Sequence, residues 1–376
     1  MRKKIKLVII FLLATLVFFG CLEERPDNHI SQLPPMKDQF ADYFMMGNIF
    51  NPGELSGNKG VWLTRHYNVL TAENHMKPGY LAPSKGSYNF STANTMVNTA
   101  NAAGFKVVGH TLLWHSQNAD WMNNVTSTTA LNDMKDYITA VVKNFEGKIY
   151  SWDVLNEVFP DPNMNTPTDW KQAMRSNNPW FRTIGYNFVY EGFLATRFAD
   201  PAAILYYNDY NTDNSRKAQL IHDMVRDVNL QYAALPASQK PAGEDPNRLL
   251  IEGIGIQEHH NTGIQPSAVR ATLELFKPLG VIISVSELDV LSQTWGEYSG
   301  NAGITDNGRK RHAELYGEFM ELYLEYSDII ERVTLWGVTD NQSWRARGEP
   351  LLFLSNGAAK PAYYSFVGAL EKHKAK

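Results

Sequence analysis

Cysteine is almost absent from this sequence: Cys21 is the only one among 376 residues. No disulfide can form within one chain, so the fold has to rest on its apolar core. Lysine and arginine do not outnumber aspartate and glutamate (35 against 39), and the formal net charge is -4. Binding to nucleic acid would call for an excess of clustered lysine and arginine. We therefore expect no nucleic-acid partner.

A hydrophobic run long enough to span a bilayer is also missing. The run from Leu7 to Gly20 is shorter than the roughly 20 residues that a membrane-spanning helix needs. It follows a basic start, Arg2 to Lys6, and the two together are typical of a secretory signal. Cys21 comes directly after the run, which resembles the cleavage site of a bacterial lipoprotein, where the new N-terminal cysteine is lipidated. The alternative is an ordinary signal peptide with an incidental cysteine.

The chain shows no internal repeat and, after residue 35, no low-complexity linker. We therefore predict a signal peptide at residues 1–20, a polar, proline-containing tether at 21–35 and a single domain at 36–376. Membrane contact is expected only through the N-terminal anchor. The protein would then be exported and held on the cell surface or the periplasmic face, or otherwise secreted.

Short β-branched and apolar runs alternate along the chain with longer helical patterns. One such pattern covers residues 181–198, where Phe181, Ile184, Gly185 and Phe188 share a face, and another covers 269–276. Eight β-then-α units in a chain of this length predict a (β/α)₈ or TIM barrel, an α/β fold. The predicted strands are 44–49, 68–72, 106–109, 149–155, 203–207, 249–256, 281–285 and 333–338.

Polar side chains follow seven of the eight predicted strands at the point where each strand ends. The C-terminal ends of barrel strands open at one mouth, so we expect these side chains to converge on one cleft. They are Glu73, Asn74, His110, Asn156, Glu157, Asn208, Asp209, Gln257, His259, Glu287 and Asp340.

Two of these groups, Glu157 and Glu287, end the fourth and seventh strands. An ionised carboxylate at the end of a buried strand costs free energy unless something compensates it. Two carboxylates facing each other across a barrel mouth can cleave a glycosidic bond, and in a retaining enzyme they lie roughly 5–5.5 Å apart. Pairing with arginine or lysine in a loop is the simpler interpretation of any single glutamate. The strand-end placement and the neighbouring Asn156 favour catalysis.

Four histidines, His110, His115, His259 and His260, raise the alternative of a metal centre. Their spacing matches no common ligand pattern, and amides and indoles stand among them. We interpret these side chains as hydrogen-bonding groups for sugar hydroxyls. No metal and no cofactor are expected.

Motifs on six strands resemble, in order, those of glycoside hydrolase family 10, and the resemblance runs from about residue 36 to 370. It implies an endo-1,4-β-xylanase on a (β/α)₈ barrel, which hydrolyses internal β-1,4-xylosidic bonds by retaining double displacement. Xylan or xylo-oligosaccharides would be its substrates, and we expect a monomer. The motifs are Thr71 to Lys77, Gly109 to Gln117, Trp152 to Glu157, Tyr207 to Asn211, Ser286 to Asp289, and Trp336 to Asp340 with Ser343 to Arg345.

The resemblance also implies catalytic roles. Glu157 would be the general acid/base and Glu287 the nucleophile. His259 and Asp289 would form a hydrogen-bonded relay that holds Glu287 ionised and oriented. Glu258, between Gln257 and His259, departs from the family pattern, which usually has a small residue there. We expect its charge either to disturb the relay or to point outward.

Asn156 and Gln257 would contact the 2-hydroxyl of the sugar at the cleavage point, where contacts strengthen toward the transition state. Trp336 and Trp344 would roof the cleft where a 6-hydroxymethyl group projects, and so favour xylose over glucose; packing at the barrel rim is the simpler alternative for both. The resemblance implies substrate binding by Glu73, Asn74, Lys77, His110, Trp114, Gln117, Tyr210, Trp336 and Trp344.

Two other functions stay open. One is a family member that prefers β-1,4-glucan or aryl cellobiosides, which depends on how tightly Trp344 closes the cleft. The other is a surface glycan-binding lipoprotein on an inactive hydrolase scaffold. Such proteins usually lose a catalytic carboxylate, and both carboxylates are present here.

Overall fold

The computed structural model describes residues 28–375. The predicted signal peptide, Cys21 and the first part of the tether lie outside the described residues, so these predictions stay untested. Within residues 28–375, no helix combines the length and the hydropathy that crossing a membrane requires.

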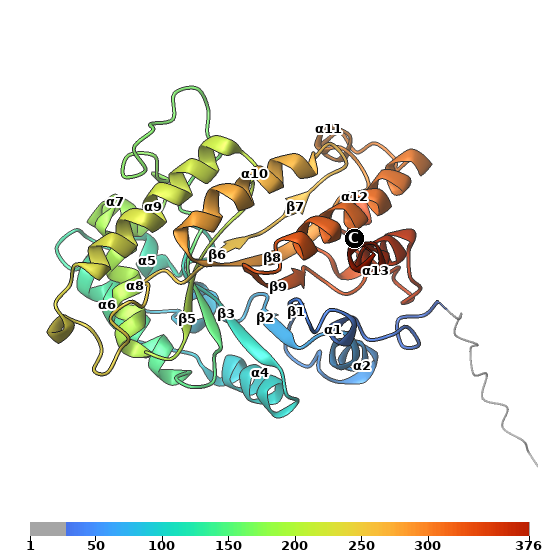
Figure 1. Cartoon of the computed structure of the whole chain (residues 1–376). Helices are drawn as coiled ribbons and strands as arrows, with labels where there is room; N and C mark the ends of the chain where they lie inside the picture. Colours follow the sequence, from blue (N-terminus) through green and yellow to red (C-terminus); the bar gives the residue numbers. More distant parts are fainter. Residues whose placement is uncertain (1–27, 376) are drawn as a thin grey trace, which may run out of the picture.

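A closed barrel of parallel strands forms the centre of the molecule, with helices around it (Figure 1). The strand order is β6-β5-β4-β3-β2-β1-β9-β8, and pairing of β6 with β8 closes the ring. The predicted (β/α)₈ fold is therefore confirmed, and all eight strands point toward one mouth. Their bounds are β1 Met45–Phe50, β2 Val69–Ala72, β3 Lys106–Leu113, β4 Ser151–Asn156, β5 Ile204–Asp209, β6 Gly253–Ile256, β8 Ile282–Val290 and β9 Ile330–Leu335.

One further strand, β7, was not predicted. It covers only His259–His260 and pairs with the far end of β8, His259 opposite Asp289 and His260 opposite Val290. β8 runs beyond its predicted end at residue 285 because its last residues make this pairing. The extension places His259 beside Asp289 at the barrel mouth.

The helices bury one face against the barrel or against each other, as expected for an amphipathic pattern. In α6, for example, Met134, Ile138 and Val141 are fully buried. The α-helices are α1 Met36–Gln39, α2 Gly57–His66, α3 Pro78–Leu81, α4 Ser91–Ala102, α5 Asp120–Asn123, α6 Ala130–Asn144, α7 Pro179–Ile184, α8 Asn187–Ala199, α9 Ser215–Ala233, α10 Pro266–Phe276, α11 Trp295–Ser299, α12 Asp306–Glu325 and α13 Pro361–Lys374.

The single helix predicted over residues 181–198 is wrong, because α7 ends at Ile184 and α8 begins at Asn187. The break is at Gly185, whose φ is +75°. A helix cannot continue through that conformation, which glycine adopts at little cost. The helix predicted over 269–276 is confirmed by α10.

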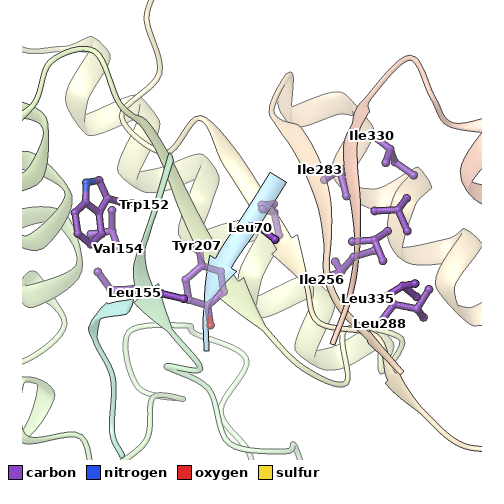
Figure 2. Close-up of a cluster of buried hydrophobic side chains, with 14 of the residues drawn as sticks. Leu70, Trp152, Val154, Leu155, Tyr207, Ile256, Ile283, Leu288, Ile330 and Leu335 are labelled. Carbon is purple, nitrogen blue, oxygen red and sulfur yellow. The ribbon is translucent and has the colours of Figure 1, made fainter. Parts of the chain in front are cut away.

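Buried apolar side chains of the strands join the barrel to its helices (Figure 2). Trp152 and Val154 of β4 lie in one group, and Ile283 of β8 and Ile330 of β9 lie in another. The edge of Trp152 meets Phe145, which follows α6, at a centroid distance of 6.1 Å. A single cysteine allows no disulfide within the chain, so this apolar core stabilises the fold.

The described part of the predicted tether, residues 28–35, packs against the barrel. Ile30 is fully buried, and its amide donates to the carbonyl of Gly357 over 2.8 Å. His29 pairs antiparallel with Ala358 in the loop before α13. The polar tether therefore does not extend to residue 35, because apolar side chains in its last residues join the domain.

Candidate active site

A cleft of about 910 Å³ opens at the barrel mouth and contains nearly all the predicted site residues. Asp289 is the exception, because it is fully buried behind His259. The predicted residues that line the cleft are Glu73, Asn74, Lys77, His110, Trp114, Gln117, Asn156, Glu157, Tyr210, Gln257, His259, Glu287, Trp336 and Trp344.

Glu157 follows β4, next to an irregular stretch of the sheet between Asp153 and Leu155. Its φ is +54°, a left-handed conformation that is uncommon outside glycine and is typical of functional positions. The indole nitrogen of Trp114 donates to Oε2 over 3.0 Å, and Nε2 of Gln257 donates to Oε1 over 3.1 Å. Both carboxylate oxygens are thus oriented by donors from other strands.

Glu287 lies within β8 and is held by two donors of a different kind. The amide of Asn208, from β5, donates to Oε1 over 2.8 Å, and Nε2 of His259 lies 3.1 Å from Oε2. The Glu287 side chain is only 7% exposed. Its charge is therefore stabilised by hydrogen bonds rather than by bulk water.

His259 bridges two carboxylates, since its Nδ1 lies 2.9 Å from Oδ1 of Asp289. Both neighbours are acceptors, and only the protonated ring can donate from both nitrogens. Burial alone would lower the pKa of His259, but Asp289 and then Glu287 outweigh it and raise the pKa to about 9. The ring is therefore an imidazolium at neutral pH.

Asp289 is held in turn by groups from the loop after β9. Burial would raise the pKa of Asp289, but His259, Arg345 and Trp344 together lower it. The guanidinium of Arg345 reaches Oδ1 at 2.5 Å, and the indole nitrogen of Trp344 donates to Oδ2 over 2.9 Å. Asp289 thus stays ionised beneath the cleft.

The two catalytic candidates are linked through side-chain amides. Oδ1 of Asn156 accepts from Nδ2 of Asn208 over 3.0 Å and from Nε2 of Gln257 over 3.2 Å. Asn208 also contacts Glu287, and Gln257 also contacts Glu157. Gly255 leaves room for Asn208, because a Cβ there would lie 2.2 Å from its Oδ1. A movement of one amide would therefore disturb both carboxylates.

Lys77, after β2, brings a positive charge to the rim near β3. Its side chain is largely buried, and Nζ lies 3.2 Å from Oδ1 of Asn74 and 5.1 Å from the centre of the Trp114 ring. Burial lowers the pKa of Lys77, and the nearby carboxylates, Glu287 and Glu73 first, oppose that shift. This part of the cleft combines a cation with an aromatic face, both suited to sugar hydroxyls and ring faces.

The two predicted roof residues differ in exposure. Trp336 is 6% exposed and meets the rings of His110 and His259 edge-on at 5.7 and 6.3 Å. Trp344 is 60% exposed, and its ring lies 5.1 Å from that of His259. Trp336 is therefore fixed by packing, whereas Trp344 presents a large free face beside the cleft.

Several site residues were missed or were given no role. Asn208 was predicted only as one of the strand-end groups, and Arg345 only as part of a motif. Arg175, in the loop after β4, and Trp295, the first residue of α11, were covered by no motif, and both line the cleft. Arg175 donates through Nε to the backbone carbonyl of Glu157 over 2.9 Å. A basic residue in a long loop carries no local signal of such a contact.

The prediction that every strand-end group lines the cleft is wrong for Asn208, which is fully buried between Asn156 and Glu287, and for two aspartates. Asp209 lies 2.8 Å from Lys217, and both side chains are fully buried. Asp340 lies 2.9 Å from Lys360, and both are almost fully buried. Each carboxylate pairs with a lysine of a helix or loop and thereby avoids an uncompensated buried charge.

Of the two alternatives for Glu258, the structure agrees with the second: its side chain points away from the His259 relay. It does so into the interior and not into solvent, because it is 1% exposed and contacts His260 and Tyr323. The four histidines are likewise dispersed over different partners: His110, for example, lies 2.9 Å from Asp153. Among residues 28–375 there is no group of three or more histidine, cysteine, aspartate or glutamate side chains arranged to hold a metal.

Comparisons with known proteins agree with this geometry. The model of the family described as Glycosyl hydrolase family 10 matches residues 35–369. An endo-1,4-beta-xylanase of Geobacillus stearothermophilus is 33% identical over 90% of this chain and 99% of its own length. A thermostable celloxylanase of Thermoclostridium stercorarium is 30% identical over 98% of this chain and 97% of its own length. The crystal structure of a bacterial Ig-like domain containing GH10 xylanase from termite gut is 50% identical, with a TM-score of 0.85 over 92% of this chain and 80% of that one.

Proposed function

Because the chain belongs to glycosyl hydrolase family 10, we propose that it is an endo-1,4-β-xylanase that cleaves internal bonds of xylan with retention. The observation that carries the proposal is the pair of carboxylates, Glu157 and Glu287, in one cleft with different donors. Retention needs two carboxylates with different tasks, and their surroundings here differ in charge.

Glu287 is the nucleophile in this proposal. A cationic His259 and a neutral amide, Asn208, both donate to it, and this favours the ionised form. One carboxylate oxygen attacks the anomeric carbon as the bond to the leaving oxygen breaks, giving a covalent glycosyl-enzyme. The imidazolium stabilises Glu287 again when water releases the sugar.

Glu157 is the general acid/base. Its donors, Trp114 and Gln257, are neutral, so no cation directly bonded to its carboxyl opposes protonation. The carboxylic acid gives its proton to the leaving oxygen in the first step, and the carboxylate takes a proton from the attacking water in the second. Asn156 and Gln257 lie between the two carboxylates, at the place proposed for the 2-hydroxyl.

The first test compares reducing-end release from soluble xylan and from carboxymethyl cellulose, with Glu287→Ala as the blank. Rapid release of mixed short xylo-oligosaccharides, with cellulose nearly inert, is the expected result. Preferred cleavage of cellulose would instead favour the β-1,4-glucan alternative, for which the 60% exposure of Trp344 leaves room. Binding of xylan without cleavage would assign the protein to the glycan-binding class.

A second test assigns the two carboxylates separately. Glu157→Ala and Glu287→Ala are assayed on an aryl β-xylobioside with a good leaving group, with and without azide. Azide should rescue Glu157→Ala by opening the glycosyl-enzyme, which gives the β-azide. It should rescue Glu287→Ala by direct attack, which gives the α-azide. The reverse pattern of products would exchange the two roles.

We also propose that the protein is exported and anchored through a lipid on Cys21. This rests on the order of basic start, apolar run and cysteine at residues 1–21 alone. Expression in a bacterium fed radiolabelled palmitate should label the wild type and not Cys21→Ser, and the activity should sediment with membranes. A soluble, unlabelled wild type would overturn the anchor. The expected monomer is tested by sedimentation velocity of residues 22–376.

A further inference from the structure

Glu258 lies between two residues of the cleft and points away from it. Gln257 and His259 on either side line the cleft, whereas the Glu258 side chain is 1% exposed and faces α12. Its φ is +60°, in the left-handed region. A long acidic side chain is unfavourable both in that conformation and in that environment. Something specific must therefore hold it there.

The carboxylate of Glu258 joins β7 to helix α12. Its Oε2 accepts from the hydroxyl of Tyr323 over 2.9 Å and lies 2.9 Å from Nε2 of His260. The His260 ring is stacked on Phe319, one turn before Tyr323, with centroids 4.9 Å apart and planes 17° from parallel. Both side chains that point away from the cleft are thus fixed to one face of α12.

The backbone of the same stretch is fixed from the other side by β8 and by Arg345. The carbonyl of Gln257 accepts from the Glu287 amide over 3.1 Å, and the carbonyl of His260 accepts from the Leu291 amide over 3.0 Å. Arg345 adds a second donor to the His260 carbonyl at 2.7 Å. Because the backbone and the side chains of Glu258 and His260 are held in place, the His259 side chain is directed toward the cleft.

We propose that Glu258 is a positioning residue: with His260 and Tyr323 it clamps β7 to α12, and thereby holds His259 against Glu287 and Gln257 against Glu157. Both partners meet the same oxygen, Oε2, so a neutral side chain that keeps one carbonyl oxygen can accept from both. The inference rests on the proposed hydrolase function for its kinetic consequences. The position of the His259 ring does not depend on that function.

The test uses two substitutions of Glu258 that distinguish the loss of the side-chain contacts from strain in the backbone. Glu258→Gln keeps an acceptor for both partners, whereas Glu258→Gly removes the clamp and accepts the left-handed φ without strain. On an aryl β-xylobioside we expect Glu258→Gln to stay within about threefold of wild type. Glu258→Gly should lose about 10- to 100-fold in kcat with KM changed little, since small displacements of a catalytic group have such effects.

Tyr326→Phe is the matched control. Tyr326 lies three residues after Tyr323, just past the C-terminal end of α12. The substitution removes a hydroxyl that bonds a different glutamate, Glu274, and its kcat should equal that of the wild type. Normal kcat with reduced thermal stability in Glu258→Gly would make Glu258 merely structural. An equal loss in Glu258→Gln and Glu258→Gly would assign the effect to charge and overturn the clamp.

A measurement without substrate separates this inference from the proposed function. With ¹³C-labelled histidine, we expect the His259 ring of the wild type to titrate in the NMR spectrum near pH 9. We expect its titration to move toward that of an ordinary histidine in Glu258→Gly and to stay in place in Glu258→Gln. An unchanged titration in Glu258→Gly refutes the clamp, even if the wild type proves inactive on xylan.

Discussion

Raising the pH above neutral should weaken the fold through one side chain, His259. Its pKa in the folded protein is about 9, against 6.5 for an ordinary histidine. Between these two values the folded protein keeps a proton that the unfolded chain releases. The stabilisation from His259 is therefore complete below about pH 6.5 and is lost as the pH rises through about 9.

The magnitude follows from the size of the shift. Each pKa unit corresponds to about 1.4 kcal/mol, so a shift from 6.5 to about 9 is worth roughly 3 kcal/mol of folding free energy. The His259 side chain is 12% exposed, so solvent screens its two carboxylate partners only weakly. Domains are stable by about 5–15 kcal/mol in total. A loss of this size is therefore easily measured.

The assay is urea denaturation of the wild type and His259→Gln at pH 7 and pH 10. Glutamine carries no titrating proton, so the fall in unfolding free energy should be about 3 kcal/mol larger in the wild type. Two other buried histidines do not interfere: burial lowers the pKa of His66 to about 4 and that of His312 well below its usual value. Their contributions change below pH 7. An equal fall in both proteins would refute the doubly donating imidazolium.

Three substitutions test the rest of the site. Gly255→Ala should displace Asn208 from Glu287, because the new Cβ would lie 2.2 Å from the amide oxygen of Asn208. We expect kcat on an aryl β-xylobioside to be about 10- to 100-fold lower. An unchanged kcat would contradict the link between the two carboxylates through side-chain amides. Trp344→Ala should raise the rate ratio of aryl cellobioside to aryl xylobioside, and a constant ratio would remove Trp344 from specificity. Arg345→Met leaves the buried Asp289 without its guanidinium and should cost about 3–5 kcal/mol in urea denaturation. A loss below about 1 kcal/mol would mean that His259 and Trp344 suffice to stabilise Asp289.

The barrel and its two carboxylates could be predicted because both signals are local. A strand of apolar residues that ends in a carboxylate is visible within five or six positions, as at Ile283 to Glu287 and Trp152 to Glu157. Parallel strands bring their ends to one mouth whatever lies between them. The cleft then places Glu157 and Glu287 together, as predicted.

The failed predictions depend on conformation and on distant partners. A helical stripe continues through Gly185 in the sequence, and only the backbone angle of +75° ends the helix there. Asp209 and Asp340 look like Glu157 in the sequence, since each also follows a strand. Each has a lysine within reach, Lys217 or Lys360, and the sequence does not tell which carboxylate has such a partner.

Glu258 is another residue whose contacts the sequence does not reveal. Gln257 and His259 line the cleft, whereas the side chains of Glu258 and His260 face α12. Family motifs describe the cleft-facing residues, because those contact the substrate. A departure such as Glu258 lies on the opposite face, where it cannot contact sugar but can move the residues that do. Differences in rate between relatives with the same cleft residues should therefore be sought on that hidden face.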